Sequence, residues 1–141
     1  MGNNKHFEDL EIWKEGMEIS KTVYVLLKDC KDYGLKEQMQ RASVSIPSNI
    51  AEGYERNGVK EKQQFMFIAK ASCGELRTHM YLAVHLNYVD TEQGNILINR
   101  IKKLSVMIYN YIQFLNKKQQ KLSPISSVSP ISPIINKNVY E

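Results

Sequence analysis

Apolar residues in the segment 97–115 recur at alternating intervals of four and three positions. The series consists of Leu97, Ile101, Leu104, Ile108, Tyr111 and Leu115. This spacing places the side chains on one face of an α-helix, whereas a half-buried strand requires an apolar residue at every second position. Asp90 precedes the series and is followed three residues later by Gln93, which is a typical start signal for a helix. We therefore predict a helix over about 91–118.

The same spacing predicts three earlier helices, over about 9–31, 35–55 and 59–87, and no segment has the alternating pattern of a strand. The helices are joined by short connections, which favour neighbours that run in opposite directions. The expected fold class is therefore all-α, and the expected architecture is an antiparallel up-down-up-down four-helix bundle.

Glycine and proline mark the helix ends and one interior point. Gly34 can adopt the left-handed conformation that closes a helix, so we expect it to end the first helix. Gly58 or Asn57 is expected to cap the third helix. Pro47, inside the second, lacks a backbone N–H and clashes with the carbonyl group of Ser43, which predicts a kink. Serine hydroxyls near this proline are expected to satisfy the backbone groups that the kink frees.

The 141 residues are enough for one domain with its own hydrophobic core. Residues 1–8 form a lead-in, residues 9–121 form the bundle, and residues 122–141, rich in serine, proline and isoleucine, are expected to be a disordered tail. The sequence has no signal peptide and no membrane-spanning run, and Cys30 and Cys73 form no CxxC pair. We therefore expect a cytoplasmic protein with no membrane partner.

Two of the predicted helices carry more apolar side chains than one core needs. In the first helix the expected core stripe contains Leu10, Trp13, Met17, Tyr24 and Leu27, and a second, adjacent stripe contains Ile12, Ile19, Val23 and Leu26. The last helix has a second stripe of Ile98, Tyr109 and Ile112. A wide apolar stripe on a small domain implies burial against another subunit, so we expect a homo-oligomer.

Charge is unevenly distributed along the chain, whose net charge is +4. Residues 93–140 contain no Asp or Glu. Positive residues of the last predicted helix include Arg100, Lys102, Lys103, Lys117 and Lys118. Such a surface attracts the phosphates of RNA or another nucleic acid, which makes these residues the candidate nucleic-acid-binding set. The alternative is a polar face that only keeps the protein soluble.

Catalytic and metal-binding chemistry finds little support in the sequence. A di-iron bundle needs a Glu-x-x-His motif on each of two helices, but Glu75 precedes His79 by four residues. The glycines are isolated, so there is no phosphate-binding loop. Ser43, Ser45 and Ser48 have no histidine near them in sequence to activate them as nucleophiles. We therefore expect no enzyme activity, no metal and no cofactor.

Four polar residues of the second predicted helix form a separate candidate site: Arg41, Asn49, Glu52 and Arg56. Their spacing places them on one polar stripe of the helix. One interpretation is a structural ion-pair network in which Glu52 pairs with Arg56 four residues later. The other is that the two guanidinium groups bind a phosphate or a carboxylate of a partner.

The segment 38–56 also resembles the signature of a known family. Its sequence is QMQRASVSIPSNIAEGYER, and it is accompanied by Phe7-x-x-Leu10-x-x-Trp13 and by Phe65-x-x-Ile68-Ala69-x-Ala71-Ser72-x-x-Glu75-Leu76. These motifs are similar to those of the four-helix bundle proteins related to the 23S rRNA intervening-sequence protein, over roughly residues 7–116. Arg41, Pro47, Asn49, Glu52 and Arg56 belong to this motif, with a structural or a binding role.

The resemblance implies a bacterial, non-catalytic protein that assembles as a ring-like homopentamer. Some relatives are encoded within insertions of 23S rRNA genes. A distantly related bundle is the accessory protein of diversity-generating retroelements, in which a basic pentamer surface engages nucleic acid and the reverse transcriptase. Nucleic-acid binding is therefore the function that the resemblance implies, and a protein-interaction scaffold is the alternative.

Overall fold

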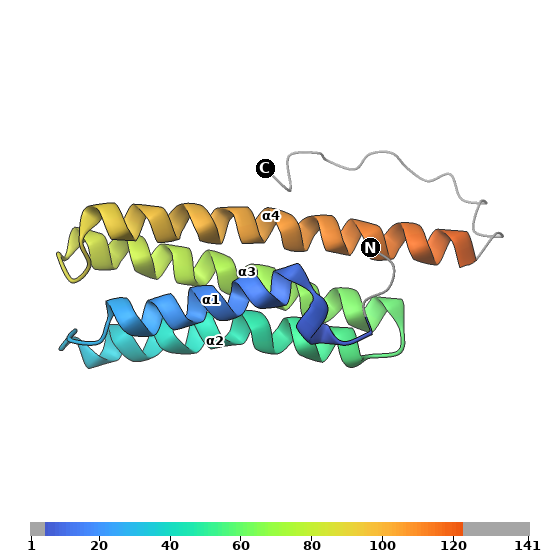
Figure 1. Cartoon of the computed structure of the whole chain (residues 1–141), viewed down its shortest axis with the longest axis horizontal. Coiled ribbons are helices and arrows are strands. Elements are labelled where there is room, and N and C mark those ends of the chain that lie inside the picture. Colours follow the sequence, from blue (N-terminus) through green and yellow to red (C-terminus); the bar gives the residue numbers. More distant parts are fainter. Residues whose placement is uncertain (1–4, 123–141) are drawn as a thin grey trace.

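A computed structural model describes residues 5–122 of the chain and the side chains of residues 5–120. A short 3-10 helix, η1, precedes four α-helices. The bounds are Phe7–Asp9 for η1, Glu11–Leu26 for α1, Tyr33–Glu55 for α2, Val59–His85 for α3 and Thr91–Leu122 for α4. Consecutive helices run in opposite directions along one long axis (Figure 1). The predicted all-α fold is confirmed, since the described part of the chain contains four α-helices and no strand.

Each long helix lies beside two others. α3 packs against α2 and α4, and α1 packs against α2 and, over a smaller contact, against α4. The backbones of α1 and α3 do not approach each other closely in the described residues, so these helices lie diagonally opposite each other in the bundle. Every helix therefore has one side in the core and one side that faces outward.

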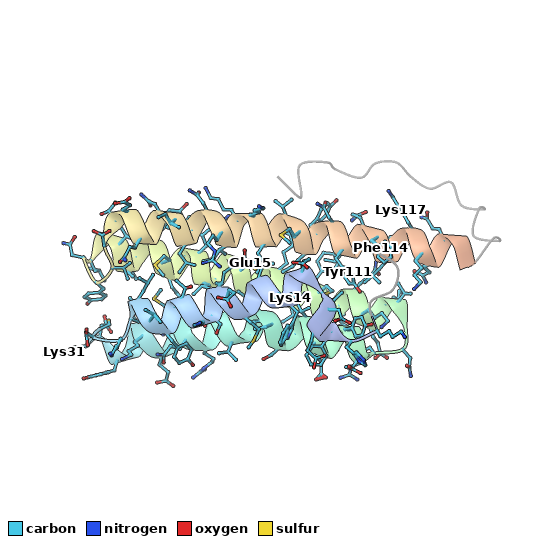
Figure 2. The ribbon with its side chains drawn as sticks, in the orientation of Figure 1. Lys14, Glu15, Lys31, Tyr111, Phe114 and Lys117 are labelled. Carbon is cyan, nitrogen blue, oxygen red and sulfur yellow. The ribbon has the colours of Figure 1, made fainter. Side chains whose placement is uncertain are left out.

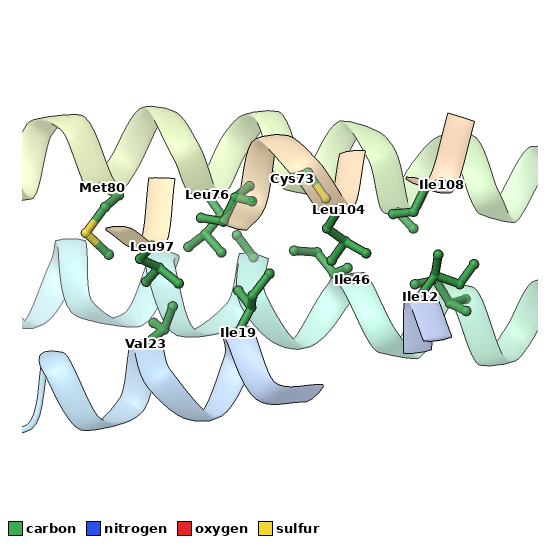
Figure 3. Packing of buried hydrophobic residues seen from close by; sticks show 14 of the residues in the cluster. Ile12, Ile19, Val23, Ile46, Cys73, Leu76, Met80, Leu97, Leu104 and Ile108 are labelled. Carbon is green, nitrogen blue, oxygen red and sulfur yellow. The ribbon is translucent and has the colours of Figure 1, made fainter. Parts of the chain in front are cut away.

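The core runs along the bundle axis and receives apolar side chains from all four helices. Figure 3 shows this packing with Ile19 and Val23 of α1, Ile46 of α2, Leu76 and Met80 of α3, and Leu97 and Leu104 of α4, all of them buried. The predicted series of α4 is buried except for Tyr111, which is half-buried. A buried leucine or isoleucine contributes about 1.5–3 kcal/mol relative to an exposed one, so this shared core is the main source of stability.

The predicted core stripe of α1 is wrong in part. Met17 and Tyr24, expected in the core, are 45% and 47% exposed, whereas Ile12, Ile19 and Val23 from the adjacent stripe are buried. α1 touches only α2 and α4 among the long helices. The positions of those two neighbours select which of two adjacent stripes turns inward, and sequence spacing gives both stripes similar weight.

The second apolar stripe of α4 does not stay exposed, which removes one reason for expecting an oligomer. Ile98 and Ile112 are 3% and 1% exposed within a single chain, and Tyr109 is half-buried. Near Ile112, Nε2 of Gln63 on α3 donates hydrogen bonds to the Ile112 carbonyl oxygen at 3.4 Å and to Oδ1 of Asn116 at 2.5 Å. The stripe is wide because α3 packs against it.

The connection between α1 and α2 also differs from the prediction. α1 ends at Leu26, and Gly34, expected to end it, lies in the first turn of α2. No glycine in the described residues has a positive φ. Instead, Oδ1 of Asp32 accepts a hydrogen bond from the Leu35 N–H at 3.1 Å and so caps α2. At the next connection, Gly58 precedes α3 as its N-cap residue, as predicted.

α2 continues as one helix through Pro47, and the kink remains a prediction. The neighbouring serines contact both the backbone and the adjacent helices, and Oγ of Ser43 donates a hydrogen bond to the carbonyl oxygen of Gln40 at 2.8 Å. Oγ of Ser43 lies 3.1 Å from Oγ of Ser20 on α1, and Oγ of Ser45 lies 2.8 Å from Oγ of Ser72 on α3. These hydroxyls link α2 to its two neighbours rather than to the carbonyl group that Pro47 leaves without a donor.

The predicted tail falls almost wholly outside the described residues, because α4 extends to Leu122 and residues 123–141 are not described. Residues 1–4 of the predicted lead-in also lie outside them. Within the described residues, no helix combines the length and apolar character needed to cross a membrane.

Candidate functional site

The outward face of α4 is positively charged. Lys102, Lys103 and Lys117 are exposed there, because these positions lie opposite the buried series of the same helix. Lys118 is exposed beside Lys117, and Figure 2 shows Lys117 on the outer side of α4 toward its C-terminal end. Within the described residues, none of these four lysines forms an ion pair with an acidic side chain. Their charge therefore remains available to a ligand.

Arg100 differs from the other members of the predicted binding set. Its Nη2 lies 2.6 Å from Oε1 of Glu15 on α1, and the two side chains are only 34% and 31% exposed. Glu15 lies on the side of α1 that faces α4, as Figure 2 shows. An arginine held by a partly buried carboxylate is already neutralised, so Arg100 joins two helices and does not belong to the free basic surface.

A second group of cations lies where the connection between α2 and α3 meets the C-terminal part of α4. Nζ of Lys62 donates a hydrogen bond to the Tyr54 carbonyl oxygen at 2.7 Å and lies 5.4 Å from the centre of the Tyr54 ring. Burial lowers the pKa of Lys62, the positive charge of Lys118 lowers it further, and Glu55 acts in the opposite direction. Lys62 was absent from the predicted set, because nothing in the sequence indicates that it lies near Lys118.

The polar stripe of α2 divides into two separate pairs. Nη2 of Arg56 lies 3.8 Å from Oε1 of Glu52, and Nη1 lies 3.8 Å from Oε2 of Glu61. The same guanidinium group lies 4.8 Å from the centre of the Phe65 ring. The predicted pairing of Glu52 with Arg56 is confirmed. Arg41 instead pairs with Glu37, at 3.2 Å.

Arg41 and Glu37 are both highly exposed and line a shallow depression between α1 and α2. The two opposite charges share this depression, which weakens its attraction for a phosphate. The two guanidinium groups of the predicted site are therefore not brought together, and each already has a carboxylate beside it.

Asn49 and Pro47 contribute to contacts between helices. Nδ2 of Asn49 donates hydrogen bonds to the carbonyl oxygen and to Oγ of Ser45, at 2.8 and 2.9 Å, and so orients the hydroxyl that meets Ser72 of α3. Pro47 is buried against α1, where a Cβ atom added at Gly16 would lie 3.4 Å from the proline ring. The family motif therefore supports helix packing at these positions.

Reactive groups are few in the described structure. Burial raises the pKa of the Cys73 thiol to about 12, so this cysteine stays protonated near neutral pH and is a poor nucleophile. Nδ1 of His79 is buried without a hydrogen-bond partner. The described residues contain no group of three or more His, Cys, Asp or Glu side chains suited to a metal ion.

The sequence of residues 8–110 matches the profile of the family described as 23S rRNA-intervening sequence protein. The match spans α1, α2, α3 and most of α4, including the motif around Pro47. The chain belongs to this family.

A solved structure supports the same fold for this member of the 23S rRNA-intervening sequence protein family. It is the crystal structure of a protein of unknown function from the S23 ribosomal protein family of Bacteroides thetaiotaomicron. The two chains superpose with a TM-score of 0.68 at 19% identity, over 72% of this chain and 97% of the other. Among curated proteins, no sequence matches this chain.

Proposed function

We propose that this protein is a non-catalytic, homo-oligomeric helical bundle that binds RNA or another nucleic acid through its basic surfaces. The observation that carries the proposal is the outward face of α4, where Lys102, Lys103 and Lys117 are exposed without an acidic partner in the described structure. Lysines that the protein leaves unneutralised attract phosphates and release condensed counterions on binding. The name of the family also places its members in the context of ribosomal RNA genes.

Self-association is proposed from exposed apolar side chains of α3, since Ile98 and Ile112 of the second stripe of α4 are buried. Ile68, Leu82 and Leu86 are each more than 40% exposed on one outward side of α3, called the apolar strip below. Ser72, Glu75 and His79 lie between Ile68 and Leu82 on the same side. Among the exposed residues of this strip only Glu75 is charged. Large apolar side chains that are exposed on one side of a helix are suited to a subunit interface.

A ring needs a second, different surface that receives the first one. Met17 and Tyr24 of α1 and Val44 of α2 are exposed on the other side of the bundle and supply apolar area there. Assembly into a ring, with five copies as the resemblance implies, would repeat the lysines of α4 around one particle. Linked copies of a weak site raise avidity without any new contact.

RNA binding can be tested by filter binding of the full chain at low and moderate salt. Lys102→Gln combined with Lys103→Gln removes two charges from the outward face of α4 and leaves the core untouched. We expect a general loss of affinity for RNA. The slope of log affinity against log salt concentration should also fall in magnitude by about 1–2.

The control is Lys21→Gln on α1 combined with Lys28→Gln in the turn that follows α1. These lysines are also exposed, and neither forms an ion pair in the described residues. We expect little change from the control. If the wild-type chain retains no RNA even at low salt, the proposed function is wrong.

The alternative is a protein-interaction scaffold, favoured by the same apolar strip of α3. In that case a protein partner covers Ile68 and Leu82, and the lysines of α4 only keep the particle soluble. Binding of a protein that survives nuclease treatment and does not weaken with salt would favour the scaffold over RNA binding.

A further inference from the structure

A groove of about 390 Å³ lies between α3 and α4, and its lining includes none of the outward-facing lysines of α4. Its lining includes Phe67, Lys70, Gly74 and Arg77 of α3, and Ile101 and Ser105 of α4. Gly74 contributes no side chain to this lining, and a Cβ atom added there would meet no side chain and no neighbouring helix within 4 Å. Two helices that pack in the core thus leave room between them at the surface.

Two positive charges face this groove. Lys70 and Arg77 are seven residues apart, which is two helical turns or roughly 10 Å along α3. Neither side chain forms an ion pair within the described residues. Burial dominates the raised pKa of the Cys73 thiol beside the groove, but the charges of Lys70 and Arg77 both reach that thiol and act to lower its pKa. The groove therefore holds two cations that the protein does not neutralise.

Aromatic rings extend the same side of α3 in both directions. The residues along this side are Phe67, Lys70, Gly74, Arg77 and Tyr81, at intervals that alternate between three and four. Phe67 and Tyr81 are 43% and 42% exposed. On the face of α3 that borders α4, the two cations therefore flank a glycine, and an aromatic residue lies beyond each cation.

Cations interleaved with exposed rings are suited to single-stranded nucleic acid. Its phosphates contact lysine and arginine, while its unpaired bases stack on aromatic rings. A duplex presents the same phosphates but hides the faces of its bases, so the rings would gain nothing from it. An acidic peptide would use the two cations and leave Phe67 and Tyr81 without a role.

We propose that the α3–α4 groove binds single-stranded RNA, with Lys70 and Arg77 contacting phosphates and Phe67 stacking on a base. This inference rests on the proposed function and adds to it a defined site and a preference for unpaired strands. The open space at Gly74 receives the sugar–phosphate backbone between the two cations. The lysines on the outward face of α4 then attract nucleic acid of any kind toward the groove.

The sharpest test fills the groove without changing the charge. In Gly74→Leu the new Cβ atom has open space around it, and leucine favours a helix more than glycine, so we expect the variant to fold. Binding of a fluorescent oligouridine to the full chain is measured by anisotropy at low salt. We expect affinity to fall about tenfold or more, because the backbone loses its place between the cations and base stacking is lost with it.

The second variant removes the charges. Lys70→Gln combined with Arg77→Gln is compared with Lys21→Gln combined with Lys28→Gln, which removes the same charge, seven residues apart in sequence, from α1 and the turn that follows it. We expect about a tenfold loss for the groove variant and less than about a threefold loss for the control, since the groove cations contact phosphates directly and Lys21 and Lys28 do not. Circular dichroism melting confirms that each variant is folded.

The outcomes separate the groove from the proposed function. If the wild-type chain does not bind the oligonucleotide at all, both proposals fall. If it binds but Gly74→Leu has no effect and the groove variant matches the control variant, RNA contacts another surface and only the groove proposal is overturned. Equal losses for duplex and single strand would refute the preference for unpaired strands. Dissociation of an oligomer by Gly74→Leu would instead identify the groove as a contact between copies of this chain, and would overturn the proposal.

Discussion

Gly53 and Gly74 are both glycines inside long helices, yet their surroundings are opposite. A Cβ atom added at Gly53 would lie 2.9 Å from Cβ of Phe65 and 3.0 Å from the carbonyl oxygen of Lys62, both on α3. At Gly74 the same atom would meet nothing within 4 Å. Gly53 therefore allows α2 and α3 to approach closely, whereas the space at Gly74 is not needed for packing.

We expect alanine to have opposite effects at these two positions. Gly53→Ala should destabilise the fold by about 1–3 kcal/mol, because a backbone carbonyl cannot move aside to accept the methyl group. Gly74→Ala should stabilise it by about 0.5–1 kcal/mol, because alanine loses less conformational freedom in a helix.

Urea unfolding followed by circular dichroism, at one fixed protein concentration, measures both changes. Shifts of the same sign in the two variants would contradict this assignment of the glycines.

At the scale of helices and turns, Asp32 connects two parts of the same end of the bundle. Oδ1 accepts the hydrogen bond that caps α2, and Oδ2 accepts a hydrogen bond from the Tyr88 hydroxyl at 3.0 Å. Tyr88 lies in the turn between α3 and α4. The hydrogen bond to Asp32 is the main reason why the pKa of Tyr88 is raised above its ordinary value of 10.0. The contribution of this bond to stability is therefore complete below pH 10 and is lost as the pH rises through the raised pKa.

Asp32→Ala removes both interactions, whereas Tyr88→Phe removes only the second. We expect Asp32→Ala to lower the free energy of unfolding by about 0.5–2 kcal/mol, which is the usual range for an N-cap. Tyr88→Phe should cause a clearly smaller loss, and its difference from the wild-type protein should shrink above pH 10 as the wild-type hydroxyl ionises. Urea titrations at pH 7 and at alkaline pH measure both effects, and equal losses at pH 7 would mean that the cap contributes nothing.

At the scale of the whole molecule, the outer surface separates apolar and basic regions. The apolar strip of α3 contains Ile68, Leu82 and Leu86, and the outward face of α4 contains the unpaired lysines. Such a division allows copies to associate through one region while another stays open to a charged ligand. Self-association and RNA binding should therefore be separable by mutation.

We expect light scattering to show a multi-copy particle at micromolar concentration. Ile68→Glu combined with Leu82→Glu should dissociate it, because a carboxylate buried in an apolar interface is strongly unfavourable. Ile96→Glu on α4, where the side chain is 56% exposed, is the matched control and should leave the assembly intact. A wild-type protein that is a single copy under these conditions would overturn the proposed oligomer.

Part of the candidate site could be predicted from local spacing. The Glu52–Arg56 pair and the exposed lysines of α4 follow from positions along one helix, and the structure places them as expected. The pairing of Arg100 with a carboxylate could not be predicted, since its partner Glu15 is 85 residues away in sequence. The groove between α3 and α4 was also missed. Its one sequence signal, the alternating stripe around Gly74, acquires meaning only when α4 is known to lie beside it.

The sequence by itself determined the number, order and approximate bounds of the helices, because the period of a helix is a local property of the backbone. The N-cap at Asp90 is of the same kind, and the Gln93 N–H does donate to its Oδ2 at 3.2 Å. The inward stripe of α1 and the covering of Ile98 and Ile112 were settled only in three dimensions. Two adjacent apolar stripes are equivalent along an isolated helix, and they become different when neighbouring helices exclude water from one of them and leave the other exposed.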